Sequence, residues 1–218
     1  MIADDLVELL LQGLRETAYM VGVASLLAAV GGLLVGVALV LTDSDGLLPA
    51  RPVNLLLGLV VNIGRSLPFI ILLVAIIPFT RAVVGTTIGT TAAIVPLTVS
   101  AIPFYARIVE TALREVDRDV IAAAHAMGAS RRQIVGKVLL REARPGLVAG
   151  LTLTMVALIG YSAMAGVIGG GGLGDLALRY GYQRFENDIM IATVVLLVVF
   201  VQFVQMAGDV IARRLAHR

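Results

Sequence analysis

Few residues in this chain could perform covalent chemistry. The sequence has no cysteine and only two histidines, which excludes a thiol nucleophile and a cysteine zinc site and argues against a histidine metal cluster. The apolar stretches contain no pair of acidic residues, no Ser–His pair and no histidine zinc motif. We therefore expect no catalytic residue, no metal and no cofactor in this chain.

The glycine-rich run at residues 169–174 contains the pattern G-x-G-x-x-G. In a nucleotide-binding protein this pattern follows a strand and opens a helix in a soluble βαβ unit. Here the run ends an apolar stretch, and the lysine of a P-loop is missing. We interpret it as a break where a helix meets a loop, or as a site of close helix packing. Any nucleotide would then be bound by a partner.

The elements that must position the remaining polar residues are apolar. Of the 218 residues, 59% are hydrophobic and 15% charged, against about 25% charged in soluble domains. The net charge of +2 does not favour nucleic-acid binding. Five stretches that carry at most one charge reach the ~20 residues that a helix needs to cross a bilayer. We predict an all-α membrane protein with one domain over residues 1–218. The predicted spans are about 17–42, 53–80, 82–106, 145–168 and 189–210.

Basic residues are unevenly distributed among the connecting segments. If the N-terminus lies outside, the cytoplasmic segments hold twelve lysines and arginines and the outer segments hold four. The positive-inside rule therefore places the N-terminus outside and the C-terminus in the cytoplasm.

One connection, residues 107–144, is much longer and more charged than the others. It reads as two short helices, the first over about Asp119–Met127 and the second over Ser130–Arg141. Gly128 suits the left-handed end of the first helix, and Ser130, with a glutamine three residues on, forms a capping box for the second. The first helix is rich in small side chains. It either presents a knob to another protein or lies on the membrane surface as an amphipathic helix.

Ala123, Ala124 and Gly128, followed by Val138-Leu-Leu140, resemble the EAA loop of binding-protein-dependent ABC importer permeases. In that family the loop forms a coupling helix that sits in a cleft of the ATPase subunit. Ala122 stands where the motif usually has glutamate, and Arg141 where it usually has proline. The resemblance implies that the residues coupled to the ATPase are Ala122, Ala123, Ala124, His125, Met127, Gly128 and Ala129.

Further blocks, spread over about residues 19–209, are similar to the permeases of methionine importers. These blocks are 61–73, 77–81, 93–99, 160–164, 171–174 and 207–209. The resemblance implies a homodimer of five-helix subunits in a bacterial inner membrane, in contact with lipid and joined to two copies of an ATPase that hydrolyses ATP. A substrate-binding lipoprotein would deliver methionine on the outer side.

Arg65 is the single charge inside the second apolar stretch. A charge near the membrane centre costs about 2.5–3.5 kcal/mol, so it usually faces a cavity or a partner. With Asn62, Ser66 and Pro68, Arg65 could mark a broken helix that lines the translocation pathway, or a gate across the dimer. Alternatively, residues 52–64 form a short interfacial helix, and Arg65 reaches the headgroups at the start of the span.

Tyr161, Ser162 and Met164 form a second candidate group, in the fourth stretch. The small residues around them permit close helix packing, while the three side chains could also line a path for a thioether substrate.

Two other functions remain open. One is an ABC permease for another amino acid. The other is an ion-coupled secondary transporter, which normally shows internal repeats and acidic residues within its spans. The single charge inside the five apolar stretches, the last of which ends at residue 208, is basic, Arg65, and none is acidic. This favours the ABC permease over the secondary transporter.

Overall fold

The computed structural model describes residues 3–216, so the two residues at each end of the expected 1–218 domain lie outside the described part. All regular structure within residues 3–216 is helical. The helices are α1 (Ala3–Thr42), α2 (Arg51–Ser66), α3 (Phe69–Ala75), α4 (Ile77–Val84), α5 (Thr90–Arg114), α6 (Arg118–Ala126), α7 (Arg131–Gln133), the π-helical η1 (Ile134–Leu139), α8 (Leu140–Glu142), α9 (Arg144–Gly166), α10 (Gly172–Leu176), the π-helical η2 (Ala177–Tyr182) and α11 (Asn187–Ala216).

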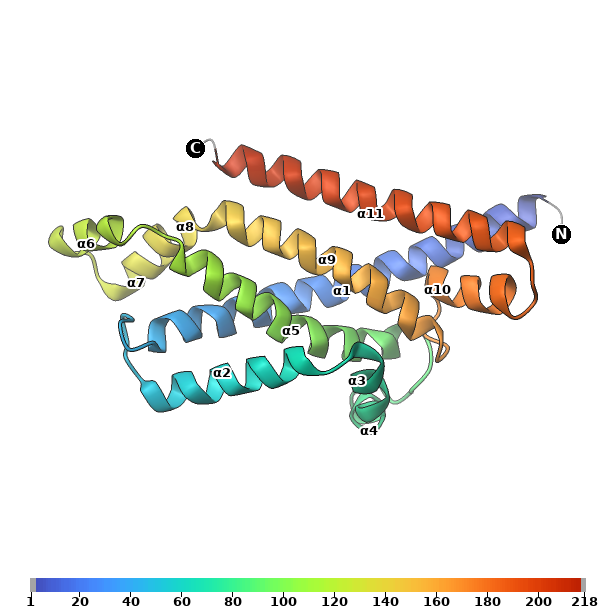
Figure 1. Ribbon diagram of the computed structural model, residues 1–218, viewed down its shortest axis with the longest axis horizontal. Helices are drawn as coiled ribbons and strands as arrows, with labels where there is room; N and C mark the ends of the chain where they lie inside the picture. Colours follow the sequence, from blue (N-terminus) through green and yellow to red (C-terminus); the bar gives the residue numbers. More distant parts are fainter. Residues whose placement is uncertain (1–2, 217–218) are drawn as a thin grey trace.

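Four helices of the described chain, α1, α5, α9 and α11, are long and apolar enough to cross a membrane. The bent pair of α2 and α3 raises the number to five if it counts as one span. The four long helices run lengthwise, and the short helices gather at their ends and along one side (Figure 1). This confirms the predicted all-α membrane fold.

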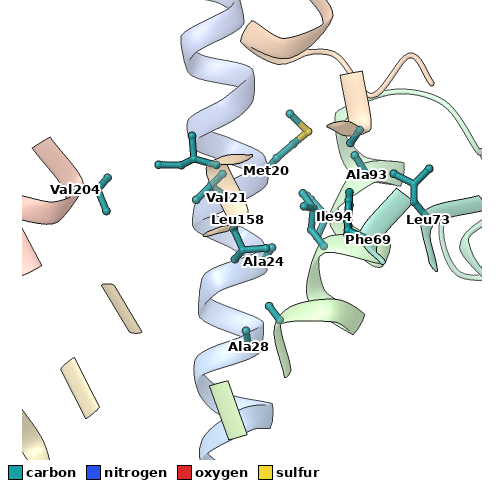
Figure 2. Close-up of a cluster of buried hydrophobic side chains, with 14 residues drawn as sticks. Met20, Val21, Ala24, Ala28, Phe69, Leu73, Ala93, Ile94, Leu158 and Val204 are labelled. Carbon is teal, nitrogen blue, oxygen red and sulfur yellow. The ribbon is translucent and has the colours of Figure 1, made fainter. Parts of the chain in front are cut away.

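The core forms where α1 packs against α5 and α9. Met20 and Ala24 of α1 are fully buried together with Leu97 of α5 and Leu158 of α9, and Figure 2 shows Met20, Val21, Ala24 and Ala28 following one another along α1. Small residues let helix backbones approach closely, which is how helices associate in lipid. At Gly36 of α1, an added Cβ would lie 2.6 Å from the carbonyl oxygen of Ala106.

The second expected span, 53–80, is not one straight helix. α2 ends at Ser66, Leu67 is extended with ψ 126°, and the axis bends by 104° between α2 and α3. The cause is Pro68, because a proline lacks an N–H donor and disfavours helical geometry in the residue before it. Figure 1 shows α2 running beside α5, whereas α3 and α4 turn away from that direction. The helix is therefore broken at Pro68, as a broken span or a re-entrant loop.

Two other boundaries also differ from expectation. The third span was expected to begin at residue 82, but α4 continues to Val84 and α5 begins only at Thr90. Gly85, at φ 83°, ends α4 in the left-handed region. The charged connection was expected to begin at residue 107, yet α5 stays helical to Arg114. Charge marks where lipid ends, and a helix can continue beyond that point. The remaining expected spans, 17–42, 145–168 and 189–210, overlap α1, α9 and α11.

Candidate functional site

The segment after α5 folds as its capping residues predict. The side chain of Asp117 accepts a hydrogen bond from the backbone N–H of Asp119 at 2.9 Å and caps α6. Gly128 follows α6 with φ 79°. Ser130 and Gln133 form the predicted capping box, in which each side chain bonds the other residue's backbone N–H. The second helix runs from Arg131 to Glu142 with a π-helical stretch in its middle.

The seven residues expected to couple to an ATPase do not share one environment. Ala124 is buried in a cluster with Val116, Ile134 and Leu139, so its side chain holds α6 against the bundle. The outward residues of the segment are Ala122, Ala123, His125, Met127 and Gly128, and Ala129 is half-buried. Met127 is 81% exposed. The segment therefore offers a small-residue surface with one long, flexible apolar side chain.

A groove of about 400 Å³ separates α6 from the connection between α1 and α2. Its lining includes Asp43, Arg118, Ala122 and His125. The His125 Nδ1 lies 3.3 Å from the carbonyl oxygen of Ile121, one turn earlier on α6.

The second candidate group lies at the break between α2 and α3. Asn62, Arg65, Ser66 and Pro68 are all exposed on the single chain. The hydroxyl of Ser66 donates to the carbonyl oxygen of Asn62 at 2.8 Å. Among the described residues, Arg65 makes no ion pair.

Of the third group, on α9, only Tyr161 contacts the segment at this break. The ring of Tyr161 stacks on Phe69, the first residue of α3, with centroids 4.7 Å apart and planes 5° from parallel. Ser162 is buried and donates to the carbonyl oxygen of Ile159 at 2.8 Å, which suits helix packing. Met164 is 46% exposed. The structure thus joins Tyr161 to the break, directs Ser162 into the bundle and leaves Met164 on the surface.

Sequence reasoning missed a polar cluster at the end of α5. Glu110 is 5% exposed and accepts hydrogen bonds from Arg107 at 2.6 Å and from Arg114 at 2.8 Å. Arg107 also donates to the side-chain oxygen of Asn62 at 2.9 Å, and Arg114 pairs with Asp43 at 2.8 Å. The i, i+3 and i, i+4 spacing of the α5 residues was a readable signal.

The glycine-rich run is both a helix break and a close packing site. The backbone N–H of Gly172 donates to the carboxylate of Glu16 at 2.7 Å, and that of Leu173 donates to Thr17 at 2.9 Å. Gly171 has φ 78°, and a Cβ there would lie 2.7 Å from a carboxylate oxygen of Glu16. These amides are already bonded to α1, which argues against a phosphate site.

Comparison with known proteins identifies the family. Residues 28–218 match the family model described as "Binding-protein-dependent transport system inner membrane component". The chain belongs to that family. It is 54% identical to a probable D-methionine transport system permease protein, MetI, of Vibrio cholerae, over 97% of this chain and 94% of the relative. It is 45% identical to the methionine import system permease protein MetP of Bacillus subtilis, over 83% and 81% of the two chains.

Solved structures agree with this family assignment. A chain of the MetNI methionine ABC transporter in an inward-facing conformation is 48% identical and superposes with a TM-score of 0.96. The match covers 98% of this chain and 99% of that one. A chain from an amino acid ABC transporter shares the fold at 20% identity, with a TM-score of 0.78.

Proposed function

We propose that this chain is the transmembrane permease subunit of an ATP-driven ABC importer for methionine. The observation that carries the proposal is the match to MetNI, at 48% identity and a TM-score of 0.96 over 98% of the chain. Relatives named for methionine transport, including MetI of Vibrio cholerae and MetP of Bacillus subtilis, support the same substrate.

In this proposal, α6 is the coupling helix that binds one of two ATPase subunits. Its outward residues Ala122 and Ala123 are small, so a partner's backbone can come close, and Met127 supplies a flexible apolar contact. Asp117 caps the start of α6 and Ser130 the start of α7, and these caps stabilise the segment that would transmit motion from the ATPase. ATP hydrolysis belongs to the partner, and this chain supplies no catalytic residue.

In a homodimer, the exposed polar residues at the α2–α3 break could contact the second copy of the chain. Arg65 lies one turn beyond Asn62, which bonds Arg107 at the cytoplasmic end of the apolar part of α5. A lone protomer would leave this exposed charge without a partner near the edge of the lipid. We infer that a second copy covers it and that Asn62, Arg65, Ser66, Pro68, Tyr161 and Met164 line or gate the path between the copies, with Ser162 supporting them from behind.

The orientation in this proposal follows from the basic residues. The connection between α1 and α2 and the segment from α6 to α8 lie at the same end of the molecule (Figure 1), and the segment from α6 to α8 carries five of the 17 lysines and arginines. This end faces the cytoplasm, with the C-terminus, and the N-terminus lies outside. A substrate-binding lipoprotein then docks at the opposite end, on the outer face of a bacterial inner membrane.

Reconstitution in proteoliposomes tests the function. The chain is purified with its ATPase and binding protein, and uptake of radiolabelled methionine is measured with and without internal ATP. Uptake that requires ATP and all three components is expected. ATP-driven uptake of a different amino acid would keep the permease and refute methionine as its substrate. Uptake driven by an ion gradient without the ATPase would refute the ABC mechanism.

A further inference from the structure

The polar cluster at the end of α5 connects segments that are distant in sequence. It consists of Asp43, Asn62, Arg107, Glu110 and Arg114, and we call it the Glu110 network. Glu110 lies at its centre, with its side chain 6% exposed. One carboxylate oxygen binds Arg107 at 2.6 Å and the other binds Arg114 at 2.8 Å. Both oxygens are therefore occupied by arginines of the same helix.

Each arginine reaches from α5 to a different segment. Arg107 uses its second terminal nitrogen to donate to Asn62 of α2, three residues before Arg65. Arg114 pairs with Asp43, in the connection that leads from α1 into α2. The carboxylate of Glu110 fixes both guanidinium groups, because charge-assisted hydrogen bonds are short and directional. One buried side chain, Glu110, thus orients both polar contacts that α5 makes here: one with α2 and one with the connection between α1 and α2.

The same turn of α5 is joined to α6. Arg114 is the last residue of α5, and α6 begins at Arg118. Leu113 and Val116 are buried in the cluster that contains Ala124 of α6. Because closely packed interiors transmit displacement, a shift of α6 moves the end of α5 with it. The Glu110 network then carries that shift to α2 through polar bonds, beside the apolar contact of Val61 with Ala106.

We propose that Glu110 is a positioning residue that makes α2 and the broken segment after it move together with the coupling helix. This proposal rests on the proposed function. Without the buried carboxylate, α6 and α5 would still respond to the ATPase, but α2 would be held to α5 by apolar contacts such as that of Val61 with Ala106 and would follow less closely. ATP would then be hydrolysed without a matching opening at the α2–α3 break.

The test compares uptake with ATP hydrolysis in the same reconstituted complex. Glu110→Gln keeps the size of the side chain and removes its charge. We expect methionine uptake per ATP hydrolysed to fall about fivefold or more, the population change that corresponds to about 1 kcal/mol. Glu115→Gln is the matched control, because Glu115 is an exposed acid at the end of the same helix. This control should keep the ratio of the wild type.

Two further variants keep the test decisive if Glu110→Gln assembles poorly. Asn62→Ala removes the α2 end of the network and should lower the same ratio; because Asn62 is also proposed to line the path, the rescue variant separates its two roles. Asn62→Asp combined with Glu110→Gln gives Arg107 a carboxylate on α2 and should restore much of the ratio, which a merely structural role of Glu110 does not predict.

The possible failures are distinguishable. If the wild-type complex shows no ATP-driven methionine uptake, the proposed function is wrong. If the wild type transports but Glu110→Gln or Asn62→Ala leaves uptake per ATP unchanged, the function stands and the role of the network is refuted. Loss of uptake and hydrolysis in equal proportion, without rescue by Asn62→Asp, also refutes it.

Discussion

Replacing Gly128 should disturb coupling through the backbone alone. Gly128 has φ 79°, and a Cβ built there would meet no atom of the chain within 4 Å. Alanine therefore creates no collision, but it must hold a left-handed conformation that costs an L-residue about 1–2 kcal/mol. That cost lowers the population of the intact end of α6 by a factor of about 5–30.

Hydrogen exchange and transport report this change separately. The backbone N–H of Ala129 bonds to the carbonyl oxygen of Ala124 at 3.1 Å and closes the end of α6. In Gly128→Ala we expect exchange at Ala129 to accelerate about 5–30-fold, and methionine uptake per ATP to fall, while the protein still inserts in the membrane. Gly128→Asn should behave more like the wild type, because asparagine tolerates left-handed geometry.

Gly136 supplies the matched control. It is an exposed glycine in η1, its φ is not positive, and a Cβ there also meets no atom of the chain within 4 Å. Gly136→Ala should leave exchange and uptake at wild-type values or slightly stabilise the helix. Wild-type exchange and uptake in Gly128→Ala would refute the backbone argument. A large loss in Gly128→Asn with normal exchange would show that space next to the ATPase, and not φ, makes glycine necessary.

Two further predictions concern helix packing, and the thermal midpoint of the purified protein tests both. Gly36→Ala brings a Cβ to 2.6 Å from the carbonyl oxygen of Ala106 and should destabilise by about 1–3 kcal/mol; Gly58→Ala, in open space on α2, should not. Tyr161→Leu removes the stack on Phe69, worth about 0.5–1.5 kcal/mol, whereas Tyr161→Phe keeps it. Equal midpoints within either pair would contradict the packing described here.

The all-helical membrane fold could be predicted from sequence because lipid excludes charge. Stretches of ~20 residues without charges have few alternatives to a spanning helix. The helix ends could not be predicted in the same way. Arg107 and Arg114 lie on α5 although they follow the apolar stretch, since a helix continues wherever its backbone hydrogen bonds are satisfied. Local capping was readable at Gly128 and Ser130, because each signal depends only on neighbours within a few residues.

Contacts between distant segments were beyond the reach of sequence patterns. Pro68 predicted a break, but the 104° bend and the stack of Phe69 on Tyr161 depend on how α3 meets α9. Glu110 shows the same limit. Its pairing with Arg107 and Arg114 follows from helical spacing, whereas the contacts of these arginines with other segments required the fold.

The contrast between Glu110 and Arg65 separates what one protomer stabilises by itself from what it leaves to a partner. Glu110 is buried, and two arginines of its own helix neutralise it. Arg65 is exposed one turn beyond Asn62, and no acidic group of the described residues pairs with it. An unpaired charge that faces lipid is costly, so an isolated protomer would carry an energetic penalty at this one site. The homodimer that we propose removes the penalty by enclosing Arg65 between two copies, and it puts the charge beside the break in α2, where a pathway would have to open.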